Sequence, residues 1–135
     1  MLLQYNYLYL LRSSDNGKTW SKPKDITGQV LTKQDGTFLG VAPGVGLTTH
    51  KGRVVMPLYV DRKQAVSIYS IDDGENWHRM AGHPYAENVD EWQMVQAPSG
   101  AIIGLGRAKK YGKTPMSISY DDGKTWIKAG KTDLY

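Results

Sequence analysis

Three copies of one short pattern constrain the fold of this chain more than any other feature. Each copy has the form Ser-x-Asp-x-Gly-x-(Thr/Asn)-Trp, and the copies begin at Ser13, Ser70 and Ser119, which are 57 and 49 residues apart. Repetition at a period of several tens of residues is typical of solenoids, propellers and other arrays of small units. Each copy lies between short runs of alternating polar and apolar residues, so we expect the repeating unit to be a small antiparallel sheet.

The pattern itself predicts a tight hairpin turn. The first copy contains Asp-Asn-Gly and the other two contain Asp-Asp-Gly, and the glycine supplies the positive φ that such turns need. The serine hydroxyl and the aspartate carboxylate can hydrogen-bond to the backbone of the turn. A calcium loop would instead need alternating oxygen ligands and a closing bidentate glutamate, which no copy has. The repeats therefore predict structural turns, with no metal and no cofactor.

The composition excludes several classes of function. The chain has 135 residues, enough for one modest domain, and a net charge of +4. Its lysines and arginines are scattered rather than interleaved with aromatics, so no nucleic-acid partner is expected. The absence of cysteine excludes disulfides and cysteine-ligated metals and leaves the redox compartment open.

The apolar N-terminus, residues 1–12, is interpreted as a strand rather than a signal peptide. It lacks a basic start and a small-residue cleavage site and runs directly into the first repeat. No run of the sequence is long enough to span a membrane as a helix, so no membrane segment is expected.

Strands are predicted on both sides of each repeat, and together they form two meanders. The predicted strands are 44–49, 53–60, 65–70 and 76–80 in the first meander and 91–97, 101–108, 114–119 and 125–128 in the second. In both meanders the repeat is the third hairpin loop. Residues 2–13 and 20–25 supply only the last two strands of an earlier unit.

Four-stranded meanders that repeat about every fifty residues are the blades of a β-propeller. We therefore expect an all-β fold that is a partial propeller of about two and a half blades: residues 1–27 end one blade, residues 43–80 form a second, and residues 91–130 form a third. A closed propeller takes at least about four blades, so the remaining blades are expected from missing sequence or another chain. Alternatively, the chain is whole and assembles with other chains, or it is a small sheet protein.

The meander topology separates two rims. The repeat turns share one rim with the loops 50–52 and 98–100, whereas the long connections 28–42 and 81–90 lie at the other rim. Long connections are where functional residues tend to lie.

One hairpin is specific enough to locate a candidate site on that second rim. Pro-Ser-Gly at 98–100 suits a three-residue loop. This loop fixes the cross-strand pairs, which are Ala97 with Ala101, Val95 with Ile103, Gln93 with Leu105, and Glu91 with Arg107. Paired side chains lie on one face with Cβ atoms ~5 Å apart, so a carboxylate would face a guanidinium. The alternative is an ion pair that only orders the rim.

These residues carry a resemblance to a known family. The three repeats resemble the Asp-boxes of sialidases (neuraminidases), six-bladed propellers, although other propellers also carry such boxes. The stretches 40–47 and 52–57 are similar to the family's Gly-Pro-Gly-x-Gly-Ile strand and Gly-Arg-Leu-Val-x-Pro partner, with Ala42 where glycine is usual. Residues 91–95 and 105–107 resemble its Glu-x-Gln-x-Val strand and the arginine that ends the next one. The resemblance covers essentially the whole chain but only the middle of the family's catalytic domain.

The resemblance implies an exo-α-sialidase that acts on sialylated glycans by a retaining mechanism with a tyrosine nucleophile and without a cofactor. In such an enzyme Glu91 is the catalytic base for the tyrosine, and Arg107 is one of three arginines that bind the sialic acid carboxylate. A guanidinium suits a carboxylate because it offers a planar, bidentate fork. A phenol with a pKa of about 10 needs a base to attack at neutral pH. The resemblance also implies a secreted, periplasmic or cell-surface location.

The resemblance leaves part of the family's active site unmatched. The first arginine and the acid/base aspartate correspond to positions upstream of this sequence, and the third arginine and the tyrosine to positions downstream of Tyr135. The isolated chain is therefore expected to be inactive. One alternative is a non-catalytic Asp-box module that binds carbohydrate or protein. Another is a propeller glycosidase that uses Asp90 and Glu91 as paired carboxylates, which is disfavoured because adjacent strand residues point to opposite faces.

Overall fold

A computed structural model of the chain describes residues 6–33, 35–36, 38–61, 63–85, 88–108 and 114–132. Over this part, the chain is built of antiparallel strands, with one helical turn, α1 (Thr27–Val30). The all-β prediction is therefore confirmed.

The N-terminal part forms a short strand pair around the first repeat. β1 (Tyr9–Leu10) pairs with β2 (Lys24–Asp25), and a hydrogen bond of 2.9 Å from the Ile26 N–H to the Leu8 carbonyl continues the ladder toward α1. The sequence predicts strands over 2–13 and 20–25. The structure forms the pair within these limits but with only two residues in each strand, and residues 1–5 lie outside the described part.

The central sheet follows in the chain. Its strands are β3 (Leu39–Val41), β4 (Leu47–Thr48), β5 (Val54–Val60), β6 (Gln64–Ser70) and β7 (His78–Arg79). β5, β6 and β7 form the predicted meander, whereas β3 and β4 both pair with the same edge of β5.

The inner edge of this sheet differs from the sequence prediction. A single strand was expected over 44–49, with 28–42 as a connection, but β3 lies inside that connection. The break between β3 and β4 has a local cause, because Pro43 has no N–H to donate and Gly44 has a φ of 106°. β3 therefore pairs with the second half of β5 and β4 with its first half.

The C-terminal sheet is a simple meander. Its strands are β8 (Val89–Gln96), β9 (Ile102–Ala108), β10 (Thr114–Ser119) and β11 (Ile127–Thr132), and they lie in the order β8-β9-β10-β11. These bounds agree with the predicted second meander to within a few residues. β11 begins two residues later and runs four residues further than the prediction of 125–128.

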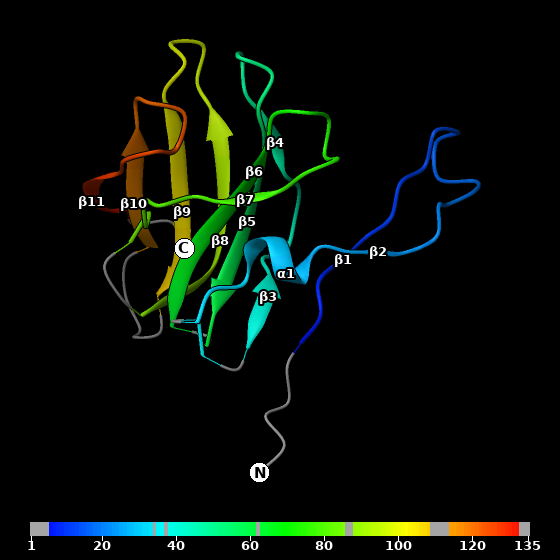
Figure 1. Cartoon of the computed structure of the whole chain (residues 1–135). Coiled ribbons are helices and arrows are strands. Elements are labelled where there is room, and N and C mark those ends of the chain that lie inside the picture. The colour runs from blue at the N-terminus through cyan, green and yellow to red at the C-terminus, as the bar shows by residue number, and fades with distance from the viewer. Residues whose placement is uncertain are drawn as a thin grey trace.

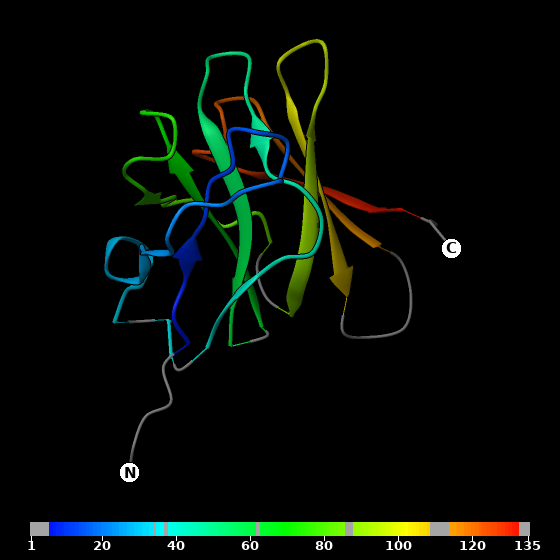
Figure 2. The same cartoon turned by 90° about the vertical axis from the view of Figure 1, so that its right-hand side faces the viewer.

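The central sheet is covered on both faces (Figures 1 and 2). On one face, Leu58, Val66 and Ile68 pack with Ile26 and Val30 from the segment around α1. The other face packs against the C-terminal sheet, in a second core that includes Val55, Ala65, Trp92, Met94 and Ile102. The three groups of strands are thus stacked in chain order.

The three repeats fold into the predicted turns and share one hydrogen-bond pattern. In each copy the serine hydroxyl donates to the aspartate carboxylate and accepts the glycine N–H at 2.8 Å. The carboxylate also accepts the N–H of the residue four positions later at 2.8–2.9 Å. The residues that need positive φ are Asn16, Gly17, Asp73, Gly74, Asp122 and Gly123. The turn is therefore closed by its own side chains.

Candidate functional site

Glu91 and Arg107 are in contact at one end of the C-terminal sheet. The hairpin register predicted from the Pro-Ser-Gly loop is present, with Val95 opposite Ile103. The Arg107 Nη1 atom lies 2.7 Å from the Glu91 Oε2 atom, so the predicted carboxylate–guanidinium pair forms. The Arg107 side chain is 59% exposed and that of Glu91 is 33% exposed, which leaves both groups accessible from the rim.

A bulge in β8 shapes the upper end of this hairpin. The register shifts between Val89 and Trp92, so Asp90 and Glu91 together lie opposite the single residue Arg107. Side chains alternate between faces only along an unbroken ladder, and a bulge re-aims them. The expectation that Asp90 and Glu91 point to opposite faces of the sheet is therefore wrong, because both carboxylates contact the Arg107 guanidinium.

Asp90 makes the more extensive contact with Arg107. Its Oδ1 atom accepts a hydrogen bond from Nε at 3.0 Å, and its Oδ2 atom accepts one from Nη2 at 2.9 Å. The Oδ1 atom also accepts the N–H of Glu91 at 2.7 Å. The Asp90 side chain is only 5% exposed, so a buried carboxylate holds an exposed guanidinium.

The electrostatics of this group follow from these contacts. The hydrogen bond to Asp90 is the main cause that raises the pKa of Arg107, and the charges of Asp90 and Glu91 and the nearby Tyr59 act in the same direction against a smaller opposing effect of burial. These contacts therefore favour the protonated guanidinium. With both carboxylates ionised, the three side chains carry a net charge of −1. Taken alone, these three charges do not attract an anionic ligand.

The candidate site lies at the rim opposite the repeat turns. Ser119 pairs with Ile102, which itself pairs with Gln96, so the third repeat lies at the end of the sheet that carries the loop 98–100. Glu91 and Arg107 lie at the other end of the same strands. Figure 1 shows the loops 50–52 and 98–100 and the turns of the second and third repeats in the upper part of the molecule. The predicted separation of the two rims is confirmed.

Trp92 positions β8 and was not identified from the sequence. Its Nε1 atom donates hydrogen bonds to the carbonyls of Leu58 at 2.8 Å and Val66 at 3.2 Å in the central sheet. It is 2% exposed and makes edge-to-face contacts with Tyr85 and Trp126, at centroid distances of 6.1 and 5.7 Å. Trp92 therefore fixes the strand that carries Glu91 against its neighbour. The available signal was its place next to Glu91, which puts it on the face toward the core.

The inner edges of the two sheets also approach closely. A Cβ atom built on Gly44 would lie 2.4 Å from the Nε2 atom of Gln93, and Gly44 has positive φ. Only glycine fits this position without displacing Gln93. The glycine-rich stretch 40–47 thus supports the strand that carries Glu91.

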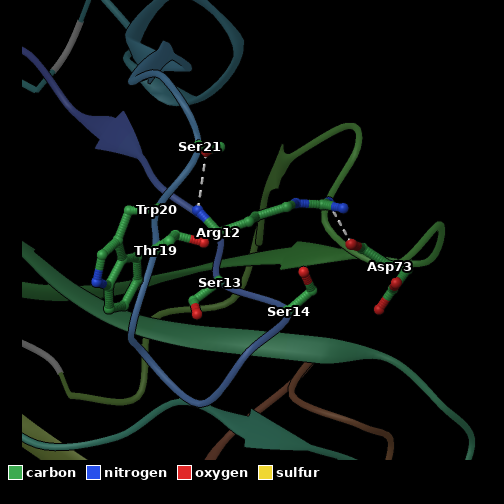
Figure 3. A pocket seen from close by; sticks show the side chains of 7 residues that line it. All are labelled: Arg12, Ser13, Ser14, Thr19, Trp20, Ser21 and Asp73. Carbon is green, nitrogen blue, oxygen red and sulfur yellow. Dashed lines mark hydrogen bonds between the residues drawn. The ribbon is translucent and has the colours of Figure 1, made fainter.

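A cavity of about 680 Å³ lies at the opposite rim, away from Glu91 and Arg107 (Figure 3). Arg12 crosses it to donate a hydrogen bond to the carbonyl of Asp73. The Arg12 Nη1 atom also lies 2.9 Å from the Glu75 Oε1 atom. Its lining residues are Arg12, Ser13, Ser14, Thr19, Trp20, Ser21 and Asp73. These contacts join the first two repeats, and the cavity contains none of the predicted site residues.

The described part of the chain contains neither a clustered metal site nor a membrane-spanning helix. No group of three or more histidine, aspartate or glutamate side chains is arranged to hold a metal ion there. Within the same residues, no helix has the length and apolar character that a membrane span requires.

Known proteins resemble this chain in sequence and in fold. It is 36% identical over 124 residues to a sialidase of Bacteroides fragilis (strain YCH46), an alignment that covers 88% of this chain and 22% of that protein. The solved structure of the Hadza microbial sialidase Hz136 matches with a TM-score of 0.83 and 32% identity, over 95% of this chain and 25% of that one. The intramolecular trans-sialidase from Ruminococcus gnavus, solved with oseltamivir carboxylate, matches with a TM-score of 0.76 and 27% identity, over 94% of this chain and 27% of that one.

The chain therefore spans about a quarter of the length of these relatives. Its unclosed antiparallel sheets have the architecture of part of a sialidase β-propeller. A family model described as a BNR repeat-like domain matches residues 3–135. The match extends over nearly the whole sequence, and the chain belongs to the BNR repeat-like domain family.

Proposed function

We propose that this chain forms part of the catalytic domain of an exo-α-sialidase, which releases terminal sialic acid from glycoconjugates. The observation that carries the proposal is the pairing of Glu91 with Arg107 at the rim opposite the repeats. The similarity to sialidases over most of the chain supports the same conclusion.

In this proposal Arg107 binds the carboxylate of sialic acid and Glu91 acts as a base. Glu91 takes the proton of a tyrosine hydroxyl supplied by another blade, and the tyrosine oxygen bonds to the anomeric carbon as the glycosidic bond breaks. An acid protonates the leaving oxygen, and water then cleaves the sugar from the tyrosine. A tyrosine nucleophile is a known variant among retaining glycosidases. A neutral phenol also meets less repulsion from the substrate carboxylate than a carboxylate nucleophile would.

The remaining blades are part of the proposal. The face of the C-terminal sheet that points away from the central sheet leaves Val95 58% exposed and Ile127 59% exposed. Apolar surface of this kind is expected to be covered in the working protein. Asp90, Glu91 and Arg107 sum to a charge of −1 when both carboxylates are ionised, so we expect further cations of the complete protein to take part in holding an anionic substrate. We therefore expect a complete propeller, meaning this segment joined to the remaining blades, to be the active species.

The test is hydrolysis of a fluorogenic sialoside by the complete propeller. Glu91→Gln is expected to lower kcat by about 10²- to 10⁴-fold, the range typical of losing a general base, with little change in KM. The matched control is Glu75→Gln, which removes a glutamate–arginine pair at the opposite rim and should leave kcat unchanged. An unchanged kcat in Glu91→Gln would overturn the assigned role.

Two other functions are separated by identifying the sugar product of the same reaction and by measuring sialoside binding. The similarity to an intramolecular trans-sialidase makes transfer within the substrate a second candidate, and it would release an anhydro sugar instead of free sialic acid. A complete propeller that binds the sialoside without any turnover would instead be a non-catalytic carbohydrate-binding module.

A further inference from the structure

We propose that Asp90 is a positioning residue for Arg107, and that it fixes which edge of the guanidinium is presented to a substrate carboxylate. This inference rests on the proposed function above. From the sequence, Asp90 was considered only as one of two paired catalytic carboxylates, an alternative that was disfavoured.

Asp90 binds one edge of the Arg107 guanidinium. Nε and Nη2 form one edge of the guanidinium, and Asp90 binds both of these atoms, at 3.0 and 2.9 Å. An arginine has five N–H donors, so this pair leaves one donor on Nη2 and two on Nη1. Glu91 lies 2.7 Å from Nη1. The edge formed by Nη1 and Nη2 is not used by Asp90, and a donor remains on each of these two nitrogens.

Asp90 and Arg107 differ strongly in burial. Asp90 is 5% exposed and Arg107 is 59% exposed. A buried carboxylate is costly unless it is paired and hydrogen-bonded. Arg107 and the N–H of Glu91 satisfy Asp90, so the buried end of the pair is fixed while the outer end faces the rim. A long side chain that would otherwise sample many rotamers is thereby held in one orientation.

The contact between Asp90 and Arg107 depends on the bulge in β8. Asp90 and Glu91 lie opposite Arg107 only because the register of β8 shifts. In a regular ladder Asp90 would point to the other face and could not reach Arg107. The bulge therefore brings an orienting carboxylate and the proposed base to one guanidinium.

Because Asp90 is negatively charged, the direction in which substrate binding changes on its removal distinguishes a purely electrostatic role from a positioning role. If Asp90 acted only through its charge, its removal would make the cluster neutral and would strengthen the binding of an anionic substrate. If it positions Arg107, its removal should weaken that binding in spite of the more favourable charge.

The experiment uses the complete propeller and three variants. In Asp90→Ala, KM for an α-sialoside should rise by about 10- to 100-fold, by analogy with the loss of a carboxylate that orients a metal ligand, and kcat should change less than KM. Asp90→Asn retains an oxygen that can accept from Arg107 and from the Glu91 N–H, so it should recover part of the loss. The matched control is Asp35→Ala, which removes another bidentate partner of an arginine, Arg79, and should leave KM unchanged in the folded protein.

Two further readouts separate positioning from a structural role. Binding of the neutral methyl ester of the sialoside should be unaffected by Asp90→Ala, because the ester carries no charge for Arg107 to hold. A crystal structure of the variant should show that the Arg107 side chain has left its present orientation. If Asp90→Ala does not fold, Asp90→Asn should still show a raised KM for the acid and an unchanged affinity for the ester.

The proposal is overturned if KM falls or stays the same, if acid and ester weaken equally, or if Arg107 keeps its orientation without Asp90. Absence of turnover and of sialoside binding by the unmodified propeller would refute the proposed function instead. In that case the crystal structure of the variant would still decide whether Asp90 positions Arg107.

Discussion

The two rims of this molecule are built in different ways. At the repeat rim, each turn is closed by hydrogen bonds between residues two to four positions apart, and three copies repeat the same pattern. At the opposite rim, Asp90 and Arg107 are 17 positions apart and meet because of a bulge. Local chemistry makes the first rim, whereas strand register and sheet packing make the second.

This difference predicts that the two rims have different roles. Substitutions at the repeat rim should change stability, and substitutions at the candidate site should change activity. The complete propeller allows both quantities to be measured on one protein.

The largest effect is expected for Arg107→Ala. Loss of the guanidinium removes the cation proposed to bind the substrate carboxylate, so KM for a sialoside should rise on the order of 10²-fold or more. The matched variant is Arg12→Ala, which removes an arginine that contacts Asp73 and Glu75 at the repeat rim. Steady-state kinetics should show no change in KM for Arg12→Ala. A similar loss in both variants would mean that the rims are not functionally separate.

A smaller effect, on stability, is expected for Ser119→Ala in the third repeat. The Ser119 side chain is fully buried, and its hydroxyl accepts the N–H of Gly123 at 2.8 Å. Leaving this buried N–H without a partner should cost about 1–3 kcal/mol, measured by urea unfolding. Ser13→Ala, in the more exposed first repeat, should cost less because water can replace the hydroxyl. Equal losses of unfolding free energy in the two variants would show that burial does not determine how much the serine hydroxyl stabilises its turn.

The repeat rim should also resist acid. The hydrogen bonds from the Thr19 side chain and backbone, together with one from Ser13, lower the pKa of Asp15 from 3.8 to about 2. Because the folded-state pKa is depressed, the stabilisation by Asp15 should be complete above about pH 4 and lost as the pH falls through about 2. NMR titration of the side-chain carboxyls, with Asp15→Asn to assign the signal, measures this directly. A midpoint near the ordinary value would contradict the hydrogen-bonded turn.

The smallest effect is expected for Glu75→Lys. The first and third repeats carry lysine at the corresponding positions, Lys18 and Lys124, whereas Glu75 pairs with Arg12 at 2.9 Å and Lys24 at 3.3 Å. These side chains are 40–60% exposed, so losing the pairs should cost about 0.2–1 kcal/mol. The loss should shrink in 1 M salt, because exposed charges are screened. A salt-independent loss would point to a packing role for Glu75.

Much of the fold could be predicted because its signals are local. The Asp-Gly turns mark the hairpins, and Pro-Ser-Gly at 98–100 fixes a loop length and therefore the pairing of Val95 with Ile103. β3 could not be predicted from such signals, because its pairing with β5 depends on where Pro43 and Gly44 break the inner edge. The role of Trp92 was also hidden, since its hydrogen-bond partners belong to another sheet.

The candidate site shows the same limit. The sequence placed Glu91 and Arg107 together by counting residues from the loop, and the contact is present. The same counting assumed an unbroken ladder, so it assigned Asp90 to the opposite face. A bulge inserts one residue without a clear mark in the sequence, and this insertion made Asp90 the bidentate partner of Arg107.

The sequence by itself determined the three turns, the strand order around them and the proximity of Glu91 to Arg107. It could do so because turn chemistry and hairpin register act over a few residues. Only the tertiary structure decided that Asp90 anchors Arg107, that Trp92 fixes β8 to the central sheet, and that the inner edge of that sheet is formed by two strands. These features depend on how separate strands pair and pack, and side chains far apart in the chain must meet before either can stabilise the other.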